Sequence, residues 1–292
     1  MTRTLCSRLG GIIVALAALL GLGGCSAVKL GYQTLPEVTY WWLDGYADFS
    51  EQQVPLVRAE LARLYNWHRT TELPKVVEVL TRVEQLAAGS VTPQQVCAFV
   101  PEITARIVAV TDQAEPALLA LMPTVNARQV RHLERKFQDR DDTWRREWLE
   151  VPRAEWTERR YQRLLDRFET VYGRLDDAQR VLLRMELERS TFDPVKVDAE
   201  RIRRRQDIVQ AVRRMQEAGL PASEVRALLR GLVERAQQPP DPADRAWRDA
   251  LVQENCRLVA VLHGSTSAEQ RERAVRRLRG WQRDLRELAA PR

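Results

Sequence analysis

The chain has 292 residues, with 46 lysines and arginines against 40 aspartates and glutamates, and a formal net charge of +6 at neutral pH. Only four of the basic residues are lysines, and the arginines alternate with acidic residues along the whole sequence. A nucleic-acid-binding protein needs a basic face that is separated from its acidic residues. The mixed charge therefore argues against a nucleic-acid partner.

The N-terminus has the three parts of a secretory signal. Arg3 and Arg8 precede an uncharged apolar segment at residues 9–22, and small residues follow directly. A basic region, a short apolar region and a small-residue cleavage site are typical of a signal peptide. The apolar segment is shorter than the roughly 20 residues that a membrane-spanning helix needs. We therefore expect residues 1–24 to be removed.

The residues around the cleavage site, Leu22-Gly23-Gly24-Cys25, resemble the signal of bacterial lipoproteins. The resemblance implies that Cys25 becomes the first residue of the mature protein and carries diacylglycerol and a further acyl chain such as palmitate. Each buried CH₂ group adds about 0.8 kcal/mol to membrane binding, so three chains form a lasting anchor. An ordinary cleaved signal is the alternative.

Ser26 follows the cysteine. In the lipoprotein family a residue other than aspartate at this position accompanies transfer to the outer membrane. The resemblance thus implies a protein of the bacterial cell envelope, anchored in the outer membrane and facing the periplasm. The lipid on Cys25 is the only expected cofactor.

Residues 25–49 form an aromatic-rich N-terminal arm. Pro36, Gly31 and Gly45 argue against one continuous helix in this arm. Its aromatic residues form a candidate binding surface, made up of Tyr40, Trp41, Trp42, Tyr46 and Phe49. We expect these rings to hold the arm against the rest of the protein. An interfacial position at the membrane and a ligand groove are the alternatives.

The same arm carries a family resemblance. The pattern of Leu30-Gly31-Tyr32, Leu35-Pro36 and the run from Tyr40 to Tyr46 resembles the mature N-terminus of an uncharacterised family of helical bacterial lipoproteins. The resemblance extends through Trp67-His68-Arg69 and Leu73-Pro74. It implies a helical fold and no known activity.

The rest of the chain has the apolar spacing of helices. Apolar residues recur every three or four positions, as at 54–68, 96–110 and 274–288, and no segment alternates with the period of two that strands show. We predict an all-α fold, an elongated multi-helix bundle of antiparallel hairpins that has two lobes. The first lobe is expected at residues 50–125 and the second at 126–292.

Two cysteines remain after the signal peptide and Cys25 are set aside. Cys97 and Cys256 are an even pair in a compartment expected to be oxidising. A disulfide between them is one interpretation, and two separate buried thiols are the other. The sequence leaves both open.

Three segments resemble the Leu-Thr-x-x-Gln motif of small helical periplasmic stress chaperones, namely residues 91–95, 175–180 and 266–271. The middle copy has Asp176 in place of threonine, and the other two lack the leucine or shift the glutamine. The resemblance implies a cradle-shaped dimer that binds unfolded clients. The alternative is that each segment is only a helix N-cap with a reciprocal glutamine or glutamate.

The sequence contains no recognisable catalytic or metal-binding motif. Its three histidines, His68, His132 and His263, have no partner at metal-ligand spacing, and His68 falls on an apolar stripe that is typical of a core residue. Neither a nucleophile elbow nor a phosphate-binding glycine loop is present. We therefore predict no catalytic residues and no metal.

Arginine-rich helical faces are the remaining feature, formed by Arg145, Arg146, Arg159, Arg160, Arg203, Arg204 and Arg205. They suggest an anionic envelope partner, such as lipid headgroups, cell-wall polymer or a protein client. Together these features predict a lipid-anchored binding or scaffolding protein without enzymatic activity. A chaperone and a hydrolase of envelope polymers are the alternatives, and the oligomeric state stays open.

Overall fold

The computed structural model describes residues 26–217 and 220–291. Within these residues all regular elements are helices and no strand occurs, which confirms the all-α prediction. The signal peptide at residues 1–24 and the motif that ends at Cys25 lie outside the described residues and stay predictions.

The first half of the chain, residues 26–150, begins with a long helix and ends with a π-helical turn. Its elements are α2 (Ser26–Ala47), α3 (Val54–Trp67), a π-helix (His68–Glu72), α4 (Leu73–Ala87), α5 (Pro93–Cys97), α6 (Phe99–Leu121), a 3₁₀ turn (Met122–Thr124), α7 (Ala127–Trp144) and a π-helix (Arg145–Leu149). The predicted lobe boundary at residue 125 falls within this half.

The second half, residues 153–291, contains α-helices only. They are α8 (Arg153–Tyr172), α9 (Asp177–Glu188), α10 (Pro194–Met215), α11 (Ala222–Gln237), α12 (Pro242–Gly264) and α13 (Ala268–Ala289). Proline occupies the first position of α10 and of α12, where its missing N–H group leaves no hydrogen bond unmade.

The prediction that Pro36 would interrupt the N-terminal arm is wrong. Helix α2 runs without a break from Ser26 to Ala47, with Pro36 inside it. An interior proline removes one backbone hydrogen bond and costs about 3 kcal/mol. Helix α2 packs against α3, α7 and α13 along its length, and this tertiary packing outweighs the local preference.

Capping boxes begin several of the helices. The side chains of Thr92, Asn126, Asp176 and Ser267 accept a hydrogen bond from the backbone N–H of the glutamine three residues later, and that glutamine accepts one from the cap's own N–H. Three of these four boxes lie in the segments that resemble the chaperone motif. Their N-cap role accounts for the spacing of the motif without any chaperone relationship.

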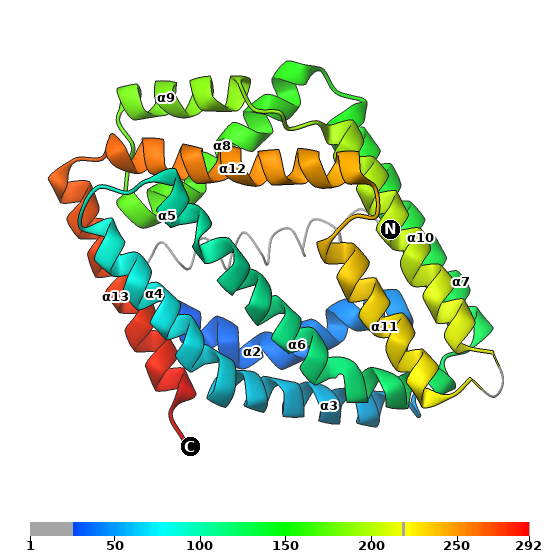
Figure 1. Cartoon of the computed structure of the whole chain (residues 1–292). Coiled ribbons are helices and arrows are strands. Elements are labelled where there is room, and N and C mark those ends of the chain that lie inside the picture. Colours follow the sequence, from blue (N-terminus) through cyan, green and yellow to red (C-terminus); the bar gives the residue numbers. More distant parts are fainter. Residues whose placement is uncertain (1–25, 218–219, 292) are drawn as a thin grey trace, which may run out of the picture.

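The helices close into a ring in the view of Figure 1 and do not extend in a row, as an elongated bundle would. Helix α13 packs along α4 on one side, and α7 packs along α10 on the other. The ring closes because α13, near the end of the chain, also contacts α2. An Arg69 guanidinium nitrogen adds a hydrogen bond of 3.2 Å to the carbonyl oxygen of Ala290.

The two halves of the chain repeat one packing scheme. The contacts of α2 with α3 and α7 correspond to those of α8 with α9 and α13, and the contact of α3 with α6 corresponds to that of α9 with α12. Each half also contains two helices that pack on the other half. Helices α10 and α11 pack on α7 and α6 of the first half, whereas α4 and α5 pack on α13 and α12 of the second.

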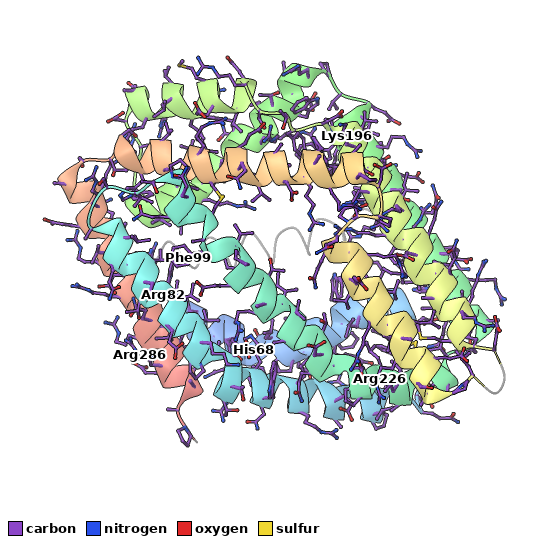
Figure 2. The ribbon with its side chains drawn as sticks, in the orientation of Figure 1. His68, Arg82, Phe99, Lys196, Arg226 and Arg286 are labelled. Atoms are coloured by element: carbon purple, nitrogen blue, oxygen red, sulfur yellow. A yellow bond between two sulfur atoms is a disulfide. The ribbon has the colours of Figure 1, made fainter. Side chains whose placement is uncertain are left out.

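We call the contact between such a helix and the half on which it packs a joint. The two joints that involve α5 and α11 are held together differently. A disulfide between Cys97 and Cys256 joins α5 to α12, so the structure has the first of the two arrangements left open for these cysteines. At the corresponding joint, Glu115 on α6 pairs with Arg226 and Arg230 on α11, at 2.6 and 2.9 Å. Figure 2 labels Arg226 at this joint.

None of the helices in the described part of the chain combines the length and the apolar composition needed to cross a bilayer.

Candidate functional site

Each half of the ring contains a pair of glutamine side chains that bond to each other. In the first half the Gln129 amide nitrogen donates to the Gln53 amide oxygen at 2.8 Å, and Gln53 donates back at 3.3 Å. In the second half Gln179 and Gln270 exchange the same two bonds at 2.8 and 3.0 Å. These amide pairs tie two helix starts together in each half.

The bonds around the two pairs also match. Gln53 donates to the carbonyl oxygen of Thr124, as Gln179 does to that of Ser265. Gln129 donates to the carbonyl of Asp48, just after α2, and Gln270 donates to that of Arg174, just after α8. These matches place the residues of the two halves in register.

A further match fixes the register of the long helices α2 and α8. The backbone N–H of Phe49 donates to the Asp44 carboxylate at 2.9 Å, and that of Leu175 donates to the Glu169 carboxylate at 3.1 Å. Asp44 therefore corresponds to Glu169. Counting along the helices from this match makes Ala47, the last residue of α2, the counterpart of Tyr172, the last residue of α8, and the loop after α8 is then one residue longer than the loop after α2.

An apolar cavity of about 450 Å³ lies in the first half, between α2, α3, α6, α7 and α10. Its apolar lining consists of Leu43, Ala47, Phe49, Leu56, Val57, Leu61, Leu64, Ala114, Ala117, Leu118, Leu121, Met122, Val125, Val130, Leu133, Ile208 and Val212. Gln129 of the first amide pair also lines it. Because the amide hydrogen bonds of Gln129 are made to Gln53 and to backbone carbonyls, its polar atoms are satisfied without a ligand.

The corresponding space in the second half is filled. There a continuous cluster of buried side chains includes Phe168, Tyr172, Leu183, Leu258 and Leu262. The matched positions in the first half are Leu43, Ala47, Val57, Ala117 and Leu121, of which the first four are smaller than their counterparts. The smaller side chains at these four positions leave space in the first half that the second half fills.

The mouth of the cavity is polar. Glu60, Arg63 and Gln113 line it, and the Arg63 and Gln113 side chains are exposed. An Arg63 guanidinium nitrogen lies 3.0 Å from a Glu60 carboxylate oxygen. An apolar interior with a few polar groups at its opening is typical of sites for small organic ligands.

The predicted aromatic binding surface divides into two sets. Tyr40 is buried, and Tyr46 and Phe49 are half-buried and line the cavity. Trp41 and Trp42 expose 63% and 58% of their surface, so the expectation that these two rings hold the arm in place is wrong. They point outward because the inner face of α2 carries Tyr40, Leu43 and Ala47, three or four residues apart.

The arginine-rich faces are mostly internally paired. Arg203 and Arg204 lie 2.6 and 2.5 Å from Glu200, Arg159 pairs with Glu155 at 2.5 Å, and Arg205 pairs with Asp141. Burial lowers the pKa of Arg160 to about 10, and its guanidinium lies 4.1 Å from the centre of the Phe192 ring. Their charges mainly join neighbouring helical turns.

The three histidines have structural partners. The His68 ring nitrogen Nδ1 lies 2.8 Å from the Tyr32 hydroxyl, and burial lowers the pKa of His68. His263 is buried between the Tyr172 hydroxyl at 2.9 Å and the Gly89 carbonyl at 2.7 Å. His132 contacts the Gly45 carbonyl at 3.1 Å. Within the described residues no group of three or more histidine, cysteine or acidic side chains is arranged to hold a metal ion.

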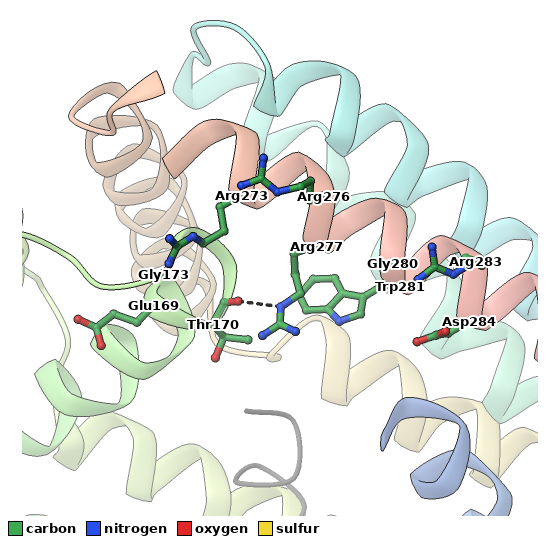
Figure 3. A pocket seen from close by; sticks show the side chains of 10 residues that line it. All are labelled: Glu169, Thr170, Gly173, Arg273, Arg276, Arg277, Gly280, Trp281, Arg283 and Asp284. Atoms are coloured by element: carbon green, nitrogen blue, oxygen red, sulfur yellow. Dashed lines mark hydrogen bonds between the residues drawn. The ribbon is translucent and has the colours of Figure 1, made fainter. Parts of the chain in front are cut away.

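A second hollow, of about 440 Å³, lies on the surface between α8 and α13 and is rich in arginine (Figure 3). Arg277 donates to the Thr170 carbonyl oxygen at 3.1 Å and lies beside the Trp281 ring. Arg273 reaches over Gly173, whose φ of 77° favours glycine. These side chains hold the two helices together and leave an open hollow, whereas the cavity of the first half is lined by five helices.

Comparison with known proteins gives a family. Residues 45–237, about two thirds of the chain, match the family of unknown function DUF6279. The chain belongs to DUF6279. The prediction of an uncharacterised family is thereby confirmed, while the lipoprotein motif stays a prediction. The matched residues of DUF6279 include the whole lining of the cavity except Thr39 and Leu43.

No curated protein and no solved structure matches the chain.

The cavity could not be predicted from the sequence. Its residues read as ordinary core positions of helices, and only the comparison of the halves shows that Ala47 and Ala117 stand where the second half has Tyr172 and Leu258. A signal was present in the spacing of Asn126 and Gln129, which repeats that of Asp176 and Gln179. This spacing alone does not show which helices pair in each half.

Proposed function

We propose that this DUF6279 protein is a non-enzymatic binding protein of the bacterial envelope, anchored through Cys25, that holds one apolar molecule in the cavity of its first half. The cavity itself carries the proposal. Its volume of about 450 Å³ is about three times that of the engineered cavity of about 150 Å³ that binds benzene. It lies within the range of about 300 to 1,000 Å³ that is usual for ligand sites.

The lining defines the chemical class of the ligand. Glu60 is the only carboxylate and Arg63 the only cation among the residues that line the cavity. Both belong to the mouth, so the interior offers a ligand mainly apolar contacts, besides the hydroxyl groups of Thr39 and Tyr46 and the already bonded Gln129. A hydrocarbon chain with a polar end at Arg63 fits this arrangement best.

The direct test is a titration of the purified protein with a fluorescent fatty acid, followed by displacement with palmitate. The change Ala117→Leu introduces the residue found at the matched position of the second half and fills part of the cavity. We expect it to weaken binding at least tenfold. Ala105→Leu places the same side chain at an exposed position of the same helix and should leave binding unchanged. Equal binding by both variants and the natural protein would refute the proposal.

The anchor has a separate test. Cys25→Ala removes the thiol that would be acylated, and it should shift the protein from the membrane fraction to the soluble periplasmic fraction. Ser26, directly after the cysteine, supports a location in the outer membrane. Continued membrane association of the Cys25→Ala protein would contradict anchoring through this residue.

A chaperone role is the second candidate, and an exposed apolar row on α6 favours it. Val100, Ile103 and Ile107 lie on one face of this helix, and the two isoleucines expose more than half of their surface. If clients bind there, Ile103→Ser with Ile107→Ser should abolish the suppression of aggregation of a denatured client. Ala105→Ser on the same helix is the control. Absence of any such suppression by the natural protein would eliminate this candidate.

A further inference from the structure

The outward side of α2 is apolar over most of its length. The side chains exposed there belong to Leu30, Leu35, Val38, Trp41 and Trp42. At 3.6 residues per turn these five positions fall within roughly 140° of the helix circumference. We call this surface the outer face of α2.

The outer face carries no charge in the described part of the chain. Besides the five apolar residues, the same arc holds Gly31, Thr34 and Gly45. The inner side packs against α3 and α7 through residues such as Tyr40, Leu43 and Ala47, and the charged residues Lys29, Glu37 and Asp44 lie outside the arc of the outer face. A contiguous exposed apolar patch on a protein marks a contact with a membrane or with another protein. We therefore expect the outer face to be covered.

A basic hollow adjoins the tryptophan end of this face. It has a volume of about 430 Å³ and is lined by Trp42 and Tyr46 from α2, by Arg140 and the buried Asp141 from α7, and by Arg201, Arg204 and Arg205 from α10, among others. Asp141 is the only carboxylate in this lining, and it pairs with Arg205. Arg140 donates from Nε to the Tyr46 hydroxyl at 3.2 Å, and no carboxylate of the described residues forms an ion pair with it. The hollow therefore offers positive charge beside an exposed aromatic ring.

We propose that the outer face of α2 docks on an anionic phospholipid surface, with Trp41 and Trp42 in the interfacial region and Arg140 against the lipid phosphates. The docking rests on the proposed anchor, because α2 begins at Ser26, one residue after Cys25. Tryptophan at the level of the headgroups, apolar side chains below it and arginine beside it are what the bilayer interface selects.

The position of the face on the chain favours a membrane over a second copy of the protein. Leu30 lies five residues after Cys25, and Trp42 lies about 18 Å further along the helix. A helix that begins one residue after its anchor can lie along the bilayer over this distance. Arg140 at the far end adds a charge that suits lipid phosphate and has no acidic counterpart on the outer face.

The test uses the full-length protein as the cell processes it, purified in detergent and reconstituted into vesicles of phosphatidylcholine and phosphatidylglycerol with brominated acyl chains. Flotation of the protein with the vesicles shows whether the lipid anchor holds it on the membrane. Quenching of tryptophan emission by the bromines shows whether the tryptophan rings contact the bilayer. We expect Trp41→Phe with Trp42→Phe to reduce this quenching by more than half, while Trp247→Phe on α12 leaves it unchanged. Trp247 is a suitable control because α12 lies across the ring from α2 and α3 (Figure 1).

Iodide in the buffer provides the opposing readout, because it quenches only rings that face water. The proposal is overturned if the protein floats but the emission of Trp41 and Trp42 is quenched by iodide and not by bromine. It is equally overturned if neither quencher reaches them, since another protein surface then covers the face. A protein that does not float would refute both the anchor and the docking.

The charge at the hollow is tested in the same vesicles. Arg140→Gln should reduce the bromine quenching about twofold, and so should replacement of phosphatidylglycerol by phosphatidylcholine. Arg135→Gln alters an exposed arginine on the same helix, rotated by roughly 140° from Arg140, and should have no effect. If quenching is insensitive to the anionic lipid and to Arg140, the headgroup contact is refuted.

Discussion

The two halves of the ring are built from corresponding helices tied by corresponding hydrogen bonds, yet one encloses a cavity and the other a filled core. The scaffold is held by backbone and amide bonds at the helix ends, such as those of Gln53 with Gln129 and of Gln179 with Gln270. The filling is decided by side chains in the middle of the helices. The comparison shows that this frame keeps its geometry while its interior changes, which is what a binding site needs.

The largest expected difference in stability between the halves concerns the joint between α5 and α12 and the corresponding joint between α11 and α6. Cys97 and Cys256 are 159 residues apart, and a crosslink over such a loop stabilises by about 4 to 5 kcal/mol in the chain-entropy model. Cys97→Ala with Cys256→Ala should lower the free energy of unfolding by nearly that much in urea titrations. Glu115→Gln breaks the ion pairs at the corresponding joint and should cost clearly less. Equal losses would show that the disulfide adds no constraint.

The next largest difference concerns a matched pair of leucines. Leu262 is completely buried in the filled core, so Leu262→Ala should cost about 3 to 5 kcal/mol, the usual loss when a new cavity opens. Leu121 is its counterpart and borders the existing cavity, so Leu121→Ala removes fewer contacts and should cost about 1 to 2 kcal/mol. Thermal unfolding of the two variants measures the difference. A loss for Leu121→Ala as large as that for Leu262→Ala would mean that the first half is packed as tightly in solution.

Local chemistry made part of this structure predictable. The capping boxes at Asp176 and Ser267 follow from residues three positions apart, and the all-helical fold follows from the spacing of apolar residues. Neither pattern shows that Gln179 and Gln270, far apart in the sequence, bond to each other. That contact depends on how the helices pack, and so does the continuity of α2 through Pro36.

The candidate site was less predictable than the fold for a similar reason. A cavity is a deficit of volume, and Ala47 or Ala117 looks like any small residue of a helix until its counterpart is known. Of the predicted aromatic surface, Tyr46 and Phe49 line the cavity, whereas Trp41 and Trp42 lie on the outer face of α2. The same short segment therefore contributes to both proposals, which the sequence alone did not separate.

Alkaline pH should lower the stability of the protein through a buried tyrosine of the filled half. Burial raises the pKa of Tyr172 to about 12 from its ordinary value near 10, and its hydroxyl bonds to His263. The fold favours the neutral phenol, so this contribution is fully present below pH 10 and is lost as the pH rises toward 12. The loss amounts to about 2 to 3 kcal/mol for one such group.

The variant Tyr172→Phe removes the phenol and so isolates its pH-dependent contribution to stability. It should be less stable than the natural protein at pH 8, because His263 loses a partner, but it should lose less stability between pH 10 and 12. The four lysines and the five other tyrosines of the chain titrate near this range as well, but they are common to both proteins and do not affect the difference between them. Parallel stability curves for the two proteins over that range would contradict the assignment.

The smallest expected effect has the opposite sign. Ala117→Leu gives the first half the leucine that Leu258 supplies in the second, and filling a cavity commonly adds about 0.5 to 2 kcal/mol of stability. Ala105→Leu, at an exposed position of α6, should stay within about 0.5 kcal/mol of the natural protein. A gain in stability for Ala117→Leu together with weaker fatty-acid binding would show that the cavity lowers the stability of the first half and provides a ligand site. A loss above about 1 kcal/mol would instead indicate overpacking, and the first half would then have no room for a ligand.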